Sequence, residues 1–346
     1  MMCATKSLQP GECLFTTWMR PDMADNNVSG THDSLNPERD PLALARSFCQ
    51  RVPHSRDLGM TIVPTEGRHA HMRLMPQPHL LDDAGAKTLC SSAVLSLVDS
   101  AAGLAVFVAT RSLNPIATLD LRMNYLRPAP TDLAMDVSAD CVAFTDDVAF
   151  VHCLVHAEGH PHPVATGDAT FMRGTSVRRF DAGPPPEPMP ATSSEATSRT
   201  ALADNTDNTA RSYADYLGLE VLAEKDGLQL RLPYQDVLIG NFLLPALHGG
   251  VLGALIEEAA RVAVRTDLRE TPLLRILNCN IDYHRPARPM DTFASVKIAR
   301  RTRRTMLVDV VCWQSKECSP VATGRVQILL ESSAVAASQP AAGTKA

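Results

Sequence analysis

The sequence lacks two features that mark common classes of binding protein: an excess of basic residues and a long uninterrupted apolar run. Its 33 lysines and arginines are outnumbered by 38 aspartates and glutamates, which gives a formal net charge of −5. Nucleic-acid-binding proteins usually carry a basic surface. The apolar run at residues 93–110 is interrupted by Asp99, so a buried helix is a better interpretation than a membrane span. We therefore expect neither nucleic acid nor a membrane as a partner.

Disulfide and export signals are missing as well. The nine cysteines are odd in number and none stands in a CxxC pair, which favours reduced thiols over a disulfide framework. Residues 1–37 are polar, are broken by proline and glycine, and lack the apolar core of a signal peptide. These features predict a disordered N-terminal segment and a cytoplasmic protein.

An internal repeat is the strongest feature that the sequence does have. A carboxylate stands nine residues after the start of two similar apolar stretches, from Cys90 to Asp99 and from His248 to Glu257. The second stretch opens on Gly249, which leaves free backbone N–H groups at the positive end of a predicted helix. That helix start is a candidate oxyanion site.

The match between the two stretches continues well beyond the helices. A tyrosine follows each carboxylate by 26 residues, at Tyr125 and Tyr283, and Val-Ala-Thr-Gly occurs at both 164–167 and 321–324. The offset between matching positions drifts only from 159 to 157. A period this constant indicates two copies of one fold.

Each copy is predicted to contain a short helix, one or two strands, a long helix and then four strands. Alternating apolar residues and intervening turns favour an antiparallel meander, and two such sheets can pair edge to edge. One long helix against a curved antiparallel sheet, formed twice, is an α+β architecture. The predicted helices are 41–51, about 90–110, 210–216 and 248–267, and the predicted strands are 58–75 (one or two), 116–126, 133–144, 149–158, 164–173, 218–223, 228–233, 274–283, 292–302, 305–315 and 321–331.

The predicted domain organisation follows from the repeat and from composition. Between the copies lies a stretch rich in proline, serine, threonine and asparagine, which is typical of a linker. The predicted segments are a disordered N-terminus (1–37), domain 1 (38–175), a linker (176–209), domain 2 (210–331) and a flexible tail (332–346).

The motifs of the second copy resemble those of the PaaI-type hotdog acyl-CoA thioesterases. Gly240-Asn241 is followed by Leu-Pro-Ala-Leu-His-Gly-Gly at 244–250, with Glu257 nine residues after the histidine. The first copy resembles the family through Asp99, through Asn-Tyr-Leu-Arg-Pro-Ala at 124–129 and through its ending at 165–173. The resemblance implies a double hotdog, two fused domains that each wrap a curved sheet around a long helix. It also implies hydrolysis of acyl-CoA, with coenzyme A as part of the substrate and no other cofactor.

The resemblance further implies two unequal sites between the domains. One site would combine the Asp99 carboxylate with Asn241, His248 and Gly249 of the second copy. The other would place Glu257 opposite Cys90-Ser91-Ser92, where the histidine and both glycines are absent, so we predict one competent site per chain. Asp99 could act as general base or as nucleophile. Asn241 would orient water or the carboxylate, and His248 would hold either the loop or the thioester.

Three further residues are candidates for binding the coenzyme. Gly250 lies at the same helix start as Gly249, and Arg303 and Arg304 stand at a predicted turn between strands, where they could bind phosphate groups. A solvated hairpin tip is the alternative for the two arginines. Four histidines at 152, 156, 160 and 162 raise the question of a metal, but the repeat does not preserve them, and we predict no metal site.

Two other functions stay open. A hotdog enoyl-CoA hydratase or dehydratase would use a catalytic histidine in motifs that the sequence does not contain. A non-catalytic acyl-CoA-binding protein would keep Asp99 and Glu257 as vestiges, and the loss of His-Gly-Gly in the first copy is compatible with it. By resemblance alone, two chains are expected to form a homodimer.

Overall fold

A computed structural model describes residues 51–63, 69–82, 88–112, 114–174, 212–224, 227–241, 245–268 and 273–331. The N-terminal segment, the linker, the C-terminal tail and nearly all of the helix predicted at 41–51 lie outside these residues. Within them, both copies contain the predicted long helix and strands.

The long helix and the longer strands of each copy follow the predicted order, and short elements that were not predicted occur at Pro53–Asp57, Pro78–Leu80, Asp236–Leu238, Ile239–Asn241 and Ala246–Leu247. The first copy contains α2 (Pro53–Asp57), β1 (Thr61–Val63), β2 (His69–Leu74), η2 (Pro78–Leu80), α3 (Ser91–Thr110), β3 (Ile116–Tyr125), β4 (Met135–Phe144), β5 (Val148–Ala157) and β6 (Ala165–Arg173). The second contains α4 (Tyr213–Leu217), β7 (Glu220–Glu224), β8 (Gly227–Leu232), η4 (Asp236–Leu238), β9 (Ile239–Asn241), β10 (Ala246–Leu247), α5 (Gly249–Asp267), β11 (Leu273–Tyr283), β12 (Thr292–Arg301), β13 (Thr305–Trp313) and β14 (Ala322–Glu331). The predicted α+β class, with one long helix against an antiparallel sheet in each copy, is confirmed.

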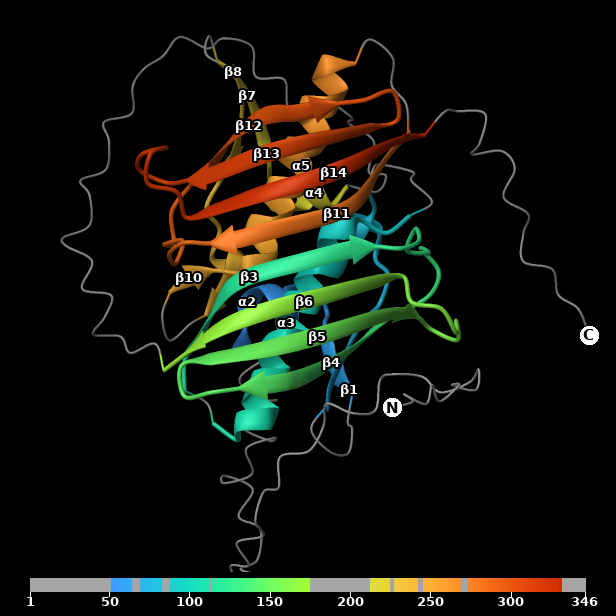
Figure 1. Cartoon of the computed structure of the whole chain (residues 1–346), viewed down its shortest axis with the longest axis vertical. Coiled ribbons are helices and arrows are strands. Elements are labelled where there is room, and N and C mark those ends of the chain that lie inside the picture. Colours follow the sequence, from blue (N-terminus) through green and yellow to red (C-terminus); the bar gives the residue numbers. More distant parts are fainter. Residues whose placement is uncertain are drawn as a thin grey trace, which may run out of the picture. The chain divides into compact units, whose positions relative to one another are not determined.

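Twelve of the described strands form one continuous antiparallel sheet in the order β1-β2-β4-β5-β6-β3-β11-β14-β13-β12-β8-β7, and β9 pairs separately with β10 (Figure 1). The two copies meet at β3 and β11, where Asn124 pairs with Asn278 and Asp120 with Asp282. This edge-to-edge pairing is the one that the sequence analysis allowed, and it covers one edge of each sheet.

The predicted meander is wrong in one respect. β3 pairs with β6 and β11 rather than with β4, which follows it in the chain. Alternating apolar residues show that a segment is a strand, but they do not specify its neighbours in the sheet. With β3 beside β6, its other edge is free to join the second copy.

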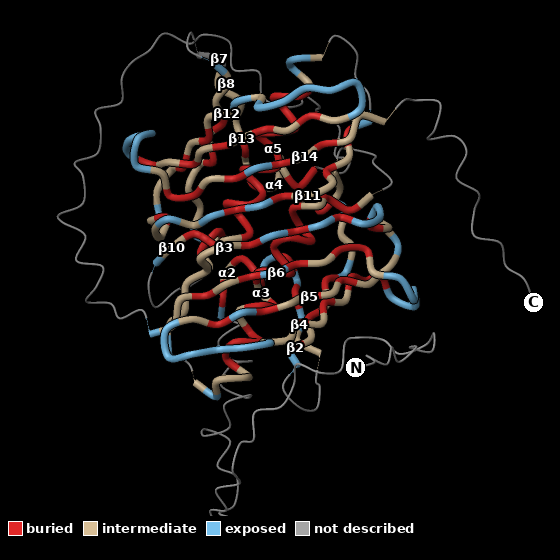
Figure 2. The backbone as a smooth tube through the Cα atoms, viewed as in Figure 1, coloured by how far each residue is buried: buried red, intermediate tan, exposed pale blue. Residues whose placement is uncertain are grey.

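The two long helices lie against the same face of the sheet, and most of their residues are buried (Figures 1 and 2). Their starts approach each other closely: a Cβ on Gly250 would lie 2.5 Å from the Ser96 Cα, and a Cβ on Gly253 would lie 2.5 Å from a methyl group of Leu95. At Gly250 the neighbour is backbone, so only glycine permits that approach. α3 is long and apolar enough to cross a membrane, but most of it is buried inside the protein, as in a core helix.

Candidate active site

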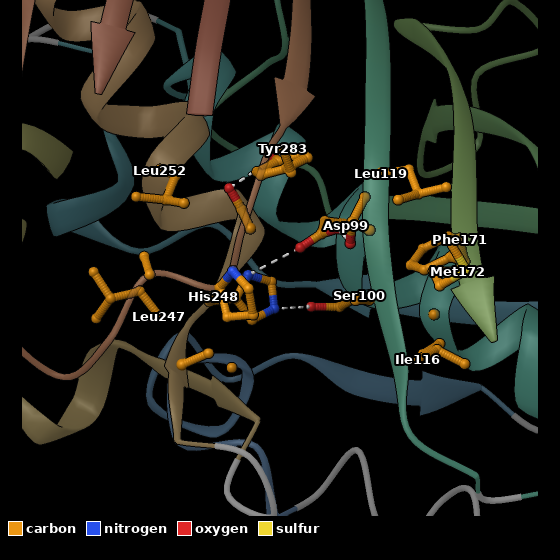
Figure 3. Close-up of a pocket in the computed structure, with 18 of the residues that line it drawn as sticks. Asp99, Ser100, Ile116, Leu119, Phe171, Met172, Leu247, His248, Leu252 and Tyr283 are labelled. Atoms are coloured by element: carbon orange, nitrogen blue, oxygen red, sulfur yellow. Dashed lines mark hydrogen bonds and ion pairs between the residues drawn. The ribbon is translucent and has the colours of Figure 1, made fainter. Parts of the chain in front are cut away.

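The Asp99 carboxylate of the first copy lies at the start of α5 of the second copy (Figure 3). One of its oxygens, Oδ2, accepts a hydrogen bond from the backbone N–H of Gly250 at 3.1 Å, and Oδ1 accepts one from the Thr118 hydroxyl at 3.1 Å. The side chain is 7% exposed. The positive end of the α5 dipole and two donors therefore stabilise this carboxylate in a nearly dry setting.

The start of α5 has the sequence that this contact requires. His248 is the N-cap residue, with extended backbone, and its Nδ1 accepts a hydrogen bond from the Gly250 N–H at 3.0 Å. A Cβ on Gly249 would lie 2.7 Å from Asp99 Oδ2, too close for any side chain without a shift of the carboxylate. Gly249 is the first residue of the helix, so its own N–H has no intrahelical partner. None is found for it among the described residues either, and Gly249 lines the cavity described below.

His248 is held as a neutral imidazole. Burial lowers the pKa of His248, and the nearby Asp99 carboxylate only partly opposes this effect. A neutral ring whose Nδ1 accepts from Gly250 carries its proton on Nε2, which lies 3.0 Å from the Ser100 hydroxyl and donates to it. The 3.3 Å contact between Nδ1 and Asp99 is therefore not an ion pair at neutral pH. The two groups share the Gly250 N–H.

A second buried histidine, His54, packs against the ring of His248. The ring centroids of His54 and His248 are 5.1 Å apart, and His54 Nε2 lies 3.0 Å from the Tyr213 hydroxyl. That hydroxyl is 3.2 Å from the hydroxyl of Ser96 on α3. Burial lowers the pKa of His54 well below its usual value, and His248 lowers it further.

These two histidines predict acid sensitivity. Because their folded-state pKa values lie below 6.5, the unfolded chain takes up protons first as the pH falls. The free energy of unfolding should therefore decrease below about pH 6.5, by up to about 1.4 kcal/mol per histidine per pH unit. Urea unfolding of the parent at pH 7.5 and 5.5 measures the decrease.

The variant His54→Gln should show a smaller decrease than the parent between these pH values. His160→Gln at an exposed position is the control and should match the parent. Equal decreases in all three proteins would contradict the assignment.

A cavity of about 300 Å³ opens beside Asp99, His248 and Gly249 and is lined by both copies. Ile116, Leu119, Phe171 and Met172 of the first copy lie on one side of Asp99, and Leu247 and Leu252 of the second lie on the other (Figure 3). Most of the lining is apolar, with the carboxylate and the helix start among the few polar groups, as in pockets for small apolar ligands.

Comparison with known proteins decides the family. The family model of the thioesterase superfamily matches the chain twice, over residues 88–163 and 244–319. A Halobacterium salinarum protein named as an esterase is 32% identical over 108 residues, which are 28% of this chain and 71% of that protein. The chain belongs to the thioesterase superfamily. The predicted tandem arrangement is confirmed, because two copies of the superfamily domain occur in one chain.

Other relatives agree with this assignment. The medium/long-chain acyl-CoA thioesterase YigI of Escherichia coli is 25% identical over 153 residues, which are 40% of this chain and 97% of YigI. A crystal structure described as that of a thioesterase from Novosphingobium aromaticivorans superposes with a TM-score of 0.53 at 18% identity, covering 78% of this chain and 98% of that one. That similarity shows the fold. Superfamily membership supports a hydrolase.

Some predicted site residues of this thioesterase-superfamily chain meet at the cavity and others do not. Asp99, His248 and Gly249 do, and Gly250 is buried beside them with its N–H on Asp99. Asn241 ends β9, where its backbone pairs with Ala246, and its side chain lies outside the described residues.

Arg303 and Arg304 are not brought to the cavity. They are exposed at the turn between β12 and β13. The register places this turn beside Leu329, whereas Tyr283, which lines the cavity, pairs with Ala322. Seven residues of β14 separate the two positions, roughly 24 Å. The sequence alone could not show that Arg303 and Arg304 lie far from the cavity, because this distance depends on how distant strands pair.

Glu257, the second predicted carboxylate, does not line the cavity. It is fully buried and accepts hydrogen bonds from Ser91 at 2.6 Å, Ser92 at 2.8 Å and Tyr125 at 2.6 Å. Burial raises the pKa of Glu257, although Arg261 and the three hydroxyl groups oppose the rise. Three hydroxyl groups of the protein thus bind the Glu257 carboxylate.

An ion-pair cluster fills the position that would be the second cavity. Arg261 is 3% exposed; its guanidinium lies 2.9 Å from Asp82 and 3.4 Å from Glu258 and donates to Ser91. In the repeat Arg261 corresponds to Gly103, since each stands four residues after the carboxylate of its helix. The same offset aligns Asp82 with Gly240, which lines the open cavity. Two glycines keep one site open where two charged side chains fill the other.

Gly103 offers a test of that contrast. A Cβ at Gly103 would meet only a methyl group of Ile116 at 3.8 Å, an ordinary contact. Gly103→Ala should therefore stabilise α3 by about 0.5–1 kcal/mol, because glycine is a poor helix former. Chemical denaturation measures the gain, and a loss of stability would show that the cavity wall at Gly103 is tighter than the structure indicates.

The Cys90 thiol is not activated as a nucleophile, and the four histidines have no metal-binding geometry in the described part of the chain. Burial raises the pKa of the Cys90 thiol to about 11, so it stays protonated at neutral pH. His152 pairs instead with Asp168 on the neighbouring strand, at 2.7 Å.

Three residues that were not predicted from the sequence as site residues contact the site. Thr118 donates to Asp99, Ser100 accepts from His248, and the Tyr283 hydroxyl donates to the Gly249 carbonyl at 2.9 Å. Tyr283 carried a signal, because the repeat pairs it with Tyr125, which binds Glu257. Ser100 and Thr118 carried none, since their roles depend on how α3 packs against α5 and β3.

Proposed function

We propose that this protein is an acyl-CoA thioesterase of the PaaI-like type, with one main active site at the Asp99 cavity between the two hotdog domains. The observation that carries the proposal is the meeting of a carboxylate from one copy with the His248-Gly249 helix start of the other, in one apolar cavity. The name of the relative YigI supports the substrate class.

The geometry suits a thioester whose carbonyl oxygen binds at the start of α5. The N–H of Gly249, at the positive end of the helix dipole, would stabilise the negative charge that develops on that oxygen. Tyr283 fixes this first turn through the Gly249 carbonyl. The apolar side chains of Leu104, Phe107, Ile116 and Phe171 would hold the acyl chain.

Asp99 would act in one of two ways. As a general base it would take a proton from water while the water attacks the carbonyl carbon, and the coenzyme thiolate would leave. As a nucleophile it would form a mixed anhydride that water then opens. Single turnovers in H₂¹⁸O test the second route: label in the Asp99 carboxylate shows an anhydride that water opened at Cγ of Asp99, whereas the first route labels only the free acid.

The activity is tested with a panel of saturated acyl-CoA and enoyl-CoA substrates. Coenzyme A release is best followed by chromatography, because Cys318 is exposed and would react with thiol reagents. We expect turnover of medium or long acyl chains. Binding without release would favour the acyl-CoA-binding alternative, and hydration of an enoyl-CoA without release would favour the hydratase.

The setting of the enzyme is also proposed. The described segments contain reduced thiols at Cys90, Cys153, Cys279, Cys312 and Cys318, which supports a reducing compartment such as the cytoplasm. Coenzyme A enters only as part of the substrate. Pairing of two such chains into a homodimer is proposed by family resemblance and is tested by sedimentation velocity.

A further inference from the structure

A polar hollow of about 190 Å³ adjoins the Asp99 cavity, and Arg285 lines both. The hollow also contains Arg288, Lys316 and the polar side chains of Gln314 and Ser319. We call this group of residues the cationic corner. It comes entirely from the second copy, at the end of the sheet where β11 delivers Tyr283 to the site.

The backbone of the cationic corner is held firmly. The Gln314 side chain is 5% exposed, accepts a hydrogen bond from the Arg288 N–H at 3.0 Å and donates to the Arg288 carbonyl at 2.8 Å. The Arg285 guanidinium donates to the carbonyls of Ser319 at 2.6 Å and Pro320 at 3.2 Å. These contacts fix the two segments that carry Arg288 and Lys316.

The residues that the structure describes supply no counterion to the cationic corner. No carboxylate forms an ion pair with Arg285, Arg288 or Lys316 in the described part of the chain. The acid nearest in sequence, Glu317, accepts a hydrogen bond from the Ser295 hydroxyl. Three cations without counterions around one hollow form a site for an anion.

The first copy has no equivalent. Pro130 and Gly159 stand where the repeat places Arg288 and Lys316, and only Arg127 remains as the counterpart of Arg285. Glu158 lies in that region and pairs with Arg73 at 3.1 Å. The cationic corner therefore occurs only beside the open cavity, in the same copy as the intact helix start.

We propose that the cationic corner binds the phosphate groups of the substrate, while its pantetheine arm passes Arg285 and delivers the thioester to Asp99. The inference rests on the proposed function and identifies the residues that bind the phosphate end of its substrate. Arg288 supplies a planar fork that matches phosphate oxygens, and Lys316 adds a point charge. The acyl chain is recognised elsewhere in the cavity, so the cationic corner acts on binding.

The test compares the double variant Arg288→Ser/Lys316→Ser with Arg303→Ser/Arg304→Ser. The control removes the same charge from the remote hairpin. For acyl-CoA, KM of the first variant should rise about tenfold or more with kcat nearly unchanged, because charged hydrogen bonds to phosphate are lost. The corresponding acyl-N-acetylcysteamine thioester lacks phosphates, and its kcat/KM should be the same in both variants and in the parent.

Calorimetry with coenzyme A and with 3′,5′-ADP separates this inference from the catalytic proposal. We expect both ligands to bind the parent and the control, and to bind the cationic-corner variant about tenfold more weakly. Such a pattern without any thioester hydrolysis would leave the phosphate site standing and refute the function. Hydrolysis with equal KM in all three proteins would leave the function standing and overturn the phosphate site.

Discussion

Asp99→Asn is expected to reduce kcat for acyl-CoA hydrolysis by about a thousandfold or more, because an amide can neither take a proton from water nor form an anhydride. General base and nucleophilic groups typically contribute 10²–10⁴-fold. The amide is nearly isosteric, and its oxygen can still accept from Gly250 or Thr118. Affinity for coenzyme A should therefore change little, so the loss falls on kcat rather than on KM.

Glu257→Gln is the matched control, since it makes the same chemical change at the equivalent position of the other copy. Glu257 accepts from three hydroxyl groups, and an amide accommodates them less well, so about 1–3 kcal/mol of stability is at stake. Circular dichroism should first show that the variant is folded at the assay temperature. Its kcat should then lie within a few-fold of the parent. Equal losses in the two variants, or a greater loss at Glu257, would refute the single asymmetric site.

The repeat was sufficient to predict the fold because both copies carry the same local signals. The constant spacing from carboxylate to tyrosine, Asp99 to Tyr125 and Glu257 to Tyr283, reflects a long helix followed by a strand that returns beneath it. The residues that signal a helix or a strand lie close together along the chain, so these elements can be predicted locally. Strand order is different: β3 pairs with β6 and β11, and no local pattern distinguishes that arrangement from a meander.

The candidate site was predictable only where its residues lie in the motifs that resemble those of the thioesterases. Asp99, His248 and Gly249 belong to those motifs, and the structure brings them to one cavity. Arg303 was a reasonable candidate by charge alone, but strand register puts it at the far end of the sheet. No local sequence pattern indicated a role for Arg288, because the residues around it in the structure are far apart along the chain.

The sequence contains the difference between the open cavity and the filled position, because the first copy has Gly103 where the second has Arg261. The consequence of this difference depends on where the Arg261 side chain points. Burial of Arg261 against Asp82 and Glu258 shows that the arginine fills space inside the protein rather than reaching solvent. Aligning the two copies residue by residue would have marked the pair, but only the packing shows that one copy is closed.

Arg261→Met is expected to lower the free energy of unfolding by about 3–5 kcal/mol, because it leaves two carboxylates in a buried cluster without their cation. Burial opposes the charge on Arg261, yet Asp82, Cys90, Glu258 and Glu257 outweigh it and raise its pKa well above the ordinary value. The residue is therefore a cation at every accessible pH. Methionine keeps the length and removes only the charge and its donors, and urea unfolding measures the loss.

The destabilisation by Arg261→Met should depend on pH in a definite direction. Arg261 is the largest influence that opposes the raised pKa of Glu257, so its removal raises that pKa further. A folded-state pKa above the unfolded value means that stability is retained at low pH and is lost as the pH rises through the folded-state pKa. The difference between parent and variant should thus be larger at pH 8 than at pH 5, with the histidine contributions cancelling in the comparison.

Activity separates a structural Arg261 from a catalytic one. At temperatures where Arg261→Met remains folded, kcat for acyl-CoA should stay within a few-fold of the parent, because the Asp99 cavity does not include this residue. The triple variant Arg261→Met/Asp82→Asn/Glu258→Gln also removes the two negative charges that Arg261 compensates and should recover much of the lost stability, since a buried ion cluster is often replaceable as a whole. A tenfold loss of kcat in the folded single variant would mean that the filled site takes part in turnover, and no loss of stability would mean that the cluster does not hold it closed.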